Sequence, residues 1–102
     1  MREHVINSPG FRAFTRAMHQ DILVFEPRER LIDACLGSVF AKGPEVVTDL
    51  ENFLVRWLVP SVSDKQLADL WSAGEADFFV TEYYIREFLT EALQKLRDRR
   101  GS

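Results

Sequence analysis

His19, Gln20 and Asp21 are the first candidates for chemistry in this sequence, in the stretch RAMHQDILVF. An imidazole and a carboxylate two residues apart could ligate a metal ion or transfer protons. A structural zinc site takes four ligands, however, and the other histidine, His4, is remote in the sequence. At the C-terminal end of a helix, a histidine favours the negative end of the dipole, while Gln20 and Asp21 can bond free backbone groups in the following turn. The residues alone therefore favour a structural role.

Cys35, the only cysteine, falls on the apolar stripe of a predicted helix, where its thiol should stay neutral. The sequence has no glycine-rich phosphate loop, HExxH pair or CxxC pair. We therefore expect no enzyme activity, no metal and no cofactor. The single cysteine and the lack of a signal pattern predict a cytoplasmic protein, and no apolar run approaches the roughly 20 residues of a membrane span.

The elements that would position these residues are helices. Apolar residues recur at three- and four-residue steps, which predicts an all-α, single-domain bundle of about five helices. The expected helices run from about Pro9 to His19, Arg28 to Lys42, Pro44 to Pro60, Ser63 to Gly74, and from Thr81 into the basic tail. Residues 1–102 then form one domain, with 1–7 and 99–102 as loose termini.

Several residues specify these helices. Ser8 and Pro9 suit an N-cap and a first helical position, and Ser63 with Gln66 has the capping-box spacing. Trp57 and Trp71 are expected in the core, and Tyr84 on the inward side of the last helix.

Charge is distributed unevenly along the chain, whose net charge is -3. Residues 44–91 contain three Lys or Arg against ten Asp or Glu, whereas residues 92–102 contain four against one. An acidic section repels phosphate backbones and attracts a basic protein partner. It can equally be a set of solvated helix faces.

Adjacent aromatic residues indicate a possible binding surface. Phe78 and Phe79, like Tyr83 and Tyr84, cannot all face inward, because neighbouring residues on a helix or strand point apart. Exposed aromatics beside acids are typical of protein interfaces, although a small satellite cluster beneath the loop fits as well. Charge and expected exposure give these candidate contact residues: Asp49, Asn52, Asp69, Glu75, Asp77, Phe78, Glu82 and Tyr83.

The order of these features resembles the small immunity proteins of bacterial contact-dependent growth inhibition systems, the CdiI type. The resemblance covers roughly residues 11–98. It is based on the His-Gln-Asp triplet after the first helix, on SDKQLADL (residues 63–70), and on REFL (residues 86–89).

The resemblance implies a protein without catalytic activity that binds the C-terminal toxin domain of a CdiA-type effector and blocks its active site or substrate groove. Many such toxins are nucleases acting on RNA, and they are often basic. The acidic middle section suits such a partner independently, because electrostatic steering speeds association. For His19, Gln20 and Asp21, the resemblance implies a turn that fixes the fold.

A rival interpretation is a small acidic helical adaptor that binds a cellular protein unrelated to toxins. A second copy of the chain is a further candidate partner for an exposed aromatic patch. Neither direct nucleic-acid binding nor membrane association is expected.

Replacing His19 with alanine should lower the melting temperature, because a side chain that stabilises a helix end is lost. Affinity for a partner, measured by calorimetry per folded molecule, should change little. Weakened binding with an unchanged melting temperature would refute the structural role.

Overall fold

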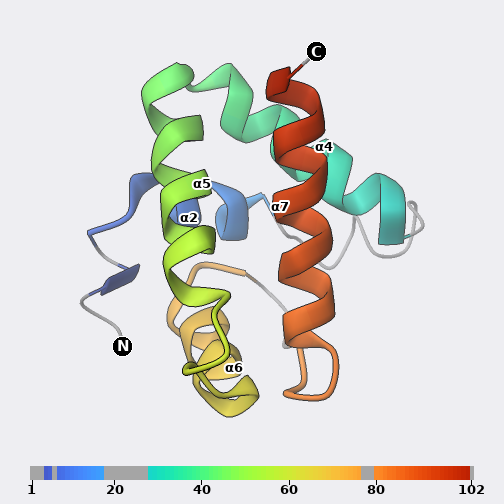
Figure 1. The fold of residues 1–102 in the computed structure, drawn as a ribbon. Helices are drawn as coiled ribbons and strands as arrows, with labels where there is room; N and C mark the ends of the chain where they lie inside the picture. Colours follow the sequence, from blue (N-terminus) through green and yellow to red (C-terminus); the bar gives the residue numbers. More distant parts are fainter. Residues whose placement is uncertain (1–3, 6, 18–27, 77–79, 102) are drawn as a thin grey trace.

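The computed structural model describes residues 4–5, 7–17, 28–76 and 80–101, and its described part forms five helices (Figure 1). They are α2 (Pro9–Arg16), α4 (Arg28–Ala41), α5 (Pro44–Trp57), α6 (Asp64–Ala73) and α7 (Ile85–Gly101). The prediction of an all-α fold is confirmed. Its radius of gyration, 12.4 Å, is close to the value expected for about 100 residues in one compact unit.

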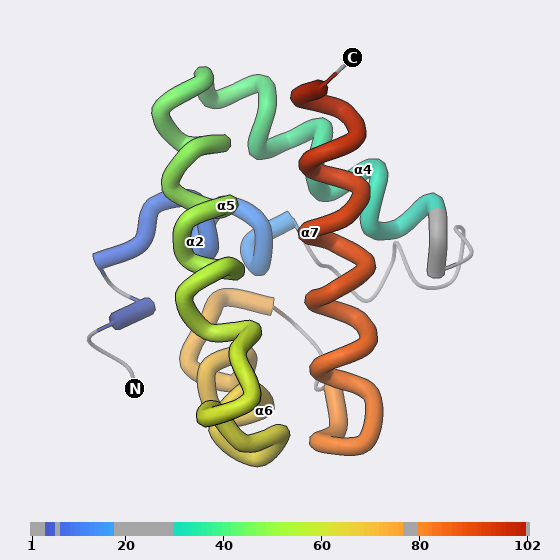
Figure 2. The backbone as a smooth tube through the Cα atoms, in the orientation of Figure 1, coloured from blue at the N-terminus to red at the C-terminus, as the bar shows by residue number. Residues whose placement is uncertain are grey.

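Helices α5 and α7 lie side by side and run in opposite directions (Figure 1). In the same view α2 lies behind α5, α4 crosses the upper end of the pair, and α6 lies below α5 (Figure 2). Each helix contributes buried apolar residues to one shared core. None of the described helices is both long and apolar enough to cross a bilayer.

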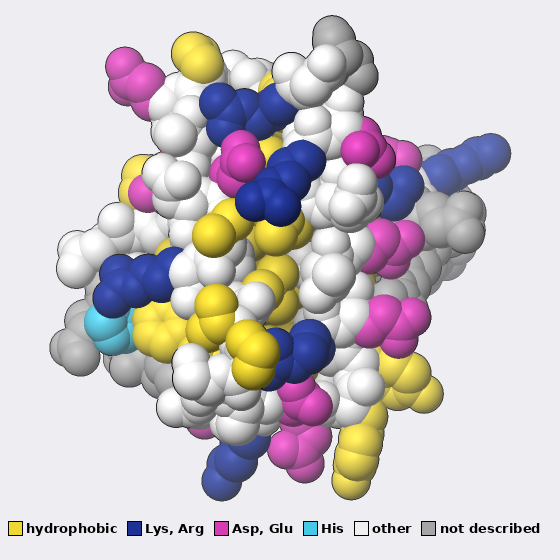
Figure 3. All heavy atoms as spheres, in the orientation of Figure 1, with side chains coloured by type: hydrophobic (Ala, Val, Ile, Leu, Met, Phe, Trp, Pro, Cys, Tyr) yellow, Lys and Arg dark blue, Asp and Glu magenta, His cyan; other side chains and the backbone are white. Residues whose placement is uncertain are grey.

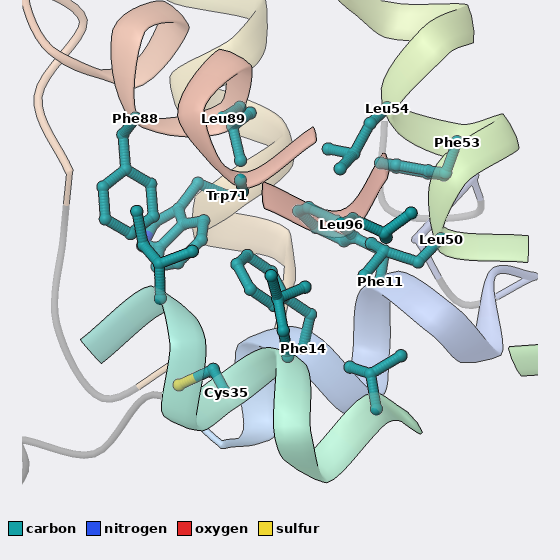
Figure 4. Packing of buried hydrophobic residues seen from close by; sticks show 14 of the residues in the cluster. Phe11, Phe14, Cys35, Leu50, Phe53, Leu54, Trp71, Phe88, Leu89 and Leu96 are labelled. Carbon is teal, nitrogen blue, oxygen red and sulfur yellow. The ribbon is translucent and has the colours of Figure 1, made fainter. Parts of the chain in front are cut away.

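The centre of the core is a group of aromatic rings (Figure 4). The rings of Phe11 and Phe53 stack with centroids 4.4 Å apart, and Trp71 meets Phe88 edge to face at 5.4 Å. These geometries are the favoured ones for aromatic pairs. Trp71 is fully buried as predicted, whereas Trp57 only packs against the edge of the core because α5 ends there.

The N-terminus of α2 is fixed to the middle of α5 by a carboxylate. Asp49 Oδ2 accepts hydrogen bonds from Ser8 Oγ at 2.6 Å and from the Gly10 backbone N–H at 2.8 Å. Ser8 Oγ in turn accepts from the Phe11 N–H, which confirms Ser8 as the N-cap. A negative charge at this end of a helix is stabilising, because it meets the positive end of the dipole and unpaired N–H groups.

Gly10 allows the two helices to approach this closely. A β-carbon at this position would lie 2.6 Å from the Val46 carbonyl oxygen and would also collide with the backbone N of Leu50. Both obstacles are backbone atoms of α5, so they could move only if the helix moved. The absence of a side chain at Gly10 is therefore a condition for the α2–α5 contact.

Thr15 connects α2 to the end of α6. Its buried hydroxyl donates to the Phe11 carbonyl at 3.0 Å and accepts from the Glu75 N–H at 3.0 Å. The capping box predicted for α6 is also present, with Ser63 and Gln66 each bonding the other's backbone N–H.

Three expectations about the chain ends and the last helix need correction. Residues 99–101, expected to be loose, continue α7, and Val5 in the N-terminal segment is 1% exposed. The helix begins at Ile85 and not near Thr81, because residues 82–84 form a turn in which the Thr81 carbonyl accepts from the Tyr84 and Ile85 N–H groups. Tyr84 is consequently 59% exposed and does not face inward.

Replacing Gly10 with alanine should lower the free energy of unfolding by about 2–3 kcal/mol, because the added carbon forces α2 away from α5. Gly37 on α4 is a matched control, since a β-carbon there would meet nothing closer than 3.9 Å. Gly37→Ala should be neutral or stabilising by up to about 1 kcal/mol. Urea denaturation measures both, and equal losses would show that the close contact at Gly10 is unimportant.

Candidate protein-binding surface

Those predicted contact residues that the structure describes do not form one continuous surface. Asp77 and Phe78 lie outside the described residues, as do His19, Gln20 and Asp21. The remaining candidates divide between residues that already have partners within the fold and residues whose side chains are exposed.

Asp49 belongs to the first group. The two hydrogen bonds that its Oδ2 accepts at the start of α2 make it a helix-capping residue and leave it only partly exposed. Sequence reasoning placed it on the solvated face of α5, because neither Ser8 nor Gly10 is near it in the chain.

Glu75 is also engaged. Its carboxylate lies 3.1 Å from Arg16 Nη2 and 3.7 Å from Arg12 Nε, both on α2. Arg12, Arg16 and Lys42 line a shallow pocket of about 200 Å³ together with this carboxylate. Glu75 therefore lies in a locally basic environment and is a weak attractor for a basic partner.

Much of the remaining acidic charge is paired in the same way. Glu51 on α5 lies 2.5 Å from Arg100 Nη1 and 3.4 Å from Arg97 Nε, and both arginines belong to α7. Asp64 at the start of α6 lies 2.6 Å from Arg86 Nε. The basic C-terminal helix thus neutralises part of the acidic section. Such exposed pairs contribute little to stability, but they remove free negative charge from the surface.

Three acidic residues are exposed and form no ion pair with any described residue: Glu45, Asp69 and Glu82. Of these, Asp69 and Glu82 were predicted as contact residues. Only Glu82 lies beside exposed aromatic side chains.

Residues 82–84 form what we call the tyrosine turn. Tyr83 is 85% exposed and Tyr84 is 59% exposed, and they are two of the three large exposed apolar residues in the described part of the chain. Figure 3 shows hydrophobic side chains projecting from the molecule beside the start of α7. The turn is anchored to the core, because Ile85 directly after it is fully buried. Glu82 and Tyr83 were predicted, and Tyr84 was missed because a helix was expected to begin earlier.

Asn52 lies elsewhere, on α5. Together with Asp49 it lines a second pocket, of about 240 Å³, between α5 and the N-terminal segment, which we call the α5 pocket. His4 belongs to this pocket, with its ring centroid 5.1 Å from that of Trp57. No local sequence signal could have indicated this contact between such distant parts of the chain.

Cys35 is 0% exposed on α4, and burial raises the pKa of its thiol to about 11. A neutral, inaccessible thiol is a poor nucleophile at neutral pH. Among the described residues, no group of three or more His, Cys, Asp or Glu side chains could hold a metal ion.

No protein-family model matches the chain, and neither does any curated protein or solved structure.

The buried thiol predicts a pH dependence of stability. Because the folded pKa of Cys35, about 11, exceeds its ordinary value of 9.0, the neutral thiol favours the folded state below pH 9, and this contribution is lost as the pH rises to 11. Between these values the native protein should lose up to about 2 kcal/mol more unfolding free energy than Cys35→Ala, as measured by urea titrations. Equal losses of unfolding free energy in the native protein and in Cys35→Ala would contradict the raised pKa of Cys35.

Proposed function

We propose that this chain is an immunity protein that binds and neutralises the C-terminal toxin domain of a CdiA-type contact-dependent growth inhibition effector. The observation that supports it best is the tyrosine turn, in which two exposed tyrosines follow a glutamate that forms no ion pair with a described residue. The order of sequence features that resembles the CdiI immunity proteins supports the same proposal.

The chemistry of the turn suits a basic protein surface. Tyrosine buries a large ring at low entropic cost, and its face attracts arginine and lysine side chains. Glu82 adds a negative charge that no described residue neutralises. Since backbone hydrogen bonds to the Thr81 carbonyl hold the turn directly before α7, little backbone freedom is lost on binding.

Neutralisation in this proposal requires no catalysis. A toxin domain that acts on RNA has a basic surface that receives its substrate, and an acidic, aromatic contact on that surface competes with the phosphate backbone. Burying the tyrosines supplies affinity, and the charge on Glu82 mainly increases the association rate.

The direct test is co-expression with the toxin-sized C-terminal fragment encoded immediately upstream. Joint elution of the two chains, with survival only when both are produced, is the expected result. Separate elution and equal survival would exclude the toxin assignment and leave the adaptor as the alternative.

Two variants test the surface itself by stopped-flow and equilibrium binding. Tyr83→Ala should weaken toxin affinity by about tenfold or more, mainly through faster dissociation. Glu82→Lys should slow association and reduce its dependence on salt. Glu45→Lys, at an equally exposed acid at the start of α5, changes the net charge identically and is the control. Equal effects of Glu45→Lys and Glu82→Lys would mean that only total charge matters.

A further inference from the structure

The α5 pocket contains a cation that no carboxylate of the described residues neutralises. Arg56 lines the pocket, is exposed, and forms no ion pair or hydrogen bond with any described residue. Its guanidinium carbon lies 5.4 Å from the centroid of the Trp57 ring. The arginines of α7 that meet Glu51 and Asp64 have carboxylate partners, so Arg56 differs from them in keeping its donors free.

The pocket also contains neutral polar groups that can donate hydrogen bonds. Asn7 and Asn52 contribute side-chain amides, each of which donates through its NH2 group and accepts through its oxygen. Among the described residues, Asp49 is the one acidic residue lining the pocket, and its Oδ2 already accepts two hydrogen bonds at the start of α2. The positive end of the α2 dipole further offsets its charge. The guanidinium of Arg56, which no described carboxylate neutralises, therefore favours an acceptor, and a carboxylate in particular, because it matches the arginine fork.

An aromatic wall borders the same pocket. The Phe53 and Trp57 ring centroids are 6.2 Å apart with an interplanar angle of 47°, and the His4 ring meets Trp57 at 62°. Figure 3 shows a histidine beside hydrophobic side chains and a basic side chain at one edge of the molecule. The Trp57 Nε1–H is buried and has no acceptor among the described residues. Buried donors are normally hydrogen-bonded, so this N–H could take an acceptor from a ligand.

We propose that the α5 pocket binds a small aromatic carboxylate. Arg56 pairs with the carboxylate, the amide of Asn52 donates to it, and the aromatic ring of the ligand packs against Trp57. A volume of about 240 Å³ accommodates a single-ring acid. This site is separate in sequence and chemistry from the tyrosine turn, so it does not rest on the proposed function.

Benzoate is the probe, and benzamide is its uncharged counterpart of the same shape. Titrating each into ¹⁵N-labelled protein, we expect benzoate to give saturable shifts of the Asn52 and Arg56 amides and of the Trp57 indole N–H, with millimolar affinity. Benzamide should bind at least about tenfold more weakly, because it cannot form the charge-assisted pair. Equal binding of the two, or no saturation by benzoate at about 20 mM, would overturn the proposal.

Variants test whether Arg56 supplies the positive charge that binds benzoate. Arg56→Gln should weaken benzoate binding at least about tenfold, and Arg56→Lys should weaken it less, because lysine keeps the charge without the fork. Arg30→Gln, at an exposed arginine of α4 outside the lining of the pocket, changes the net charge equally and should leave binding unchanged. An equal loss of benzoate affinity in Arg30→Gln and Arg56→Gln would mean that only the overall charge matters, and it would refute the site.

Discussion

The attachment of α2 to α5 is the constraint on which the other contacts of the core depend. Asp49 satisfies the start of α2, and Gly10 permits the backbones to meet, so that Phe11 is brought against Phe53 and Trp71. From the same helix, the Thr15 hydroxyl binds the backbone after α6. A short helix of eight residues is marginal alone, and here its packing and its capping by another helix stabilise it.

This attachment also shapes the surface. Asp49 is withdrawn from solvent to cap α2, and Glu75 is held near Arg12 and Arg16 because Thr15 fixes its backbone N–H. Two residues after Asp49 on α5, Glu51 is met by arginines of α7. An acidic stretch of sequence consequently becomes a surface of mostly paired charges, on which the tyrosine turn with Glu82 stands out.

The two candidate sites differ in the chemistry that they offer. The tyrosine turn projects into solvent with aromatic and acidic groups, which suits a large basic partner. The α5 pocket is concave, lined by polar side chains, an arginine and aromatic rings, and formed where the N-terminal segment meets α5. Its existence follows from the α2–α5 attachment, because Ser8 and Asp49 contribute to its lining and also hold the helices together.

The sequence by itself determined the helices, because capping and apolar periodicity are local. Ser8, Ser63 and Gln66 cap where their spacing predicts, and the stripes containing Cys35 and Trp71 are buried. The exposure of Tyr83 also followed from local geometry, since adjacent side chains point apart. Only the tertiary structure decided which charges remained free and which residues formed a pocket. Asp49 and Glu75 are paired with groups 39 to 63 residues away, and His4 reaches Trp57 only because the chain folds back. Such contacts depend on how helices pack, which local spacing does not encode.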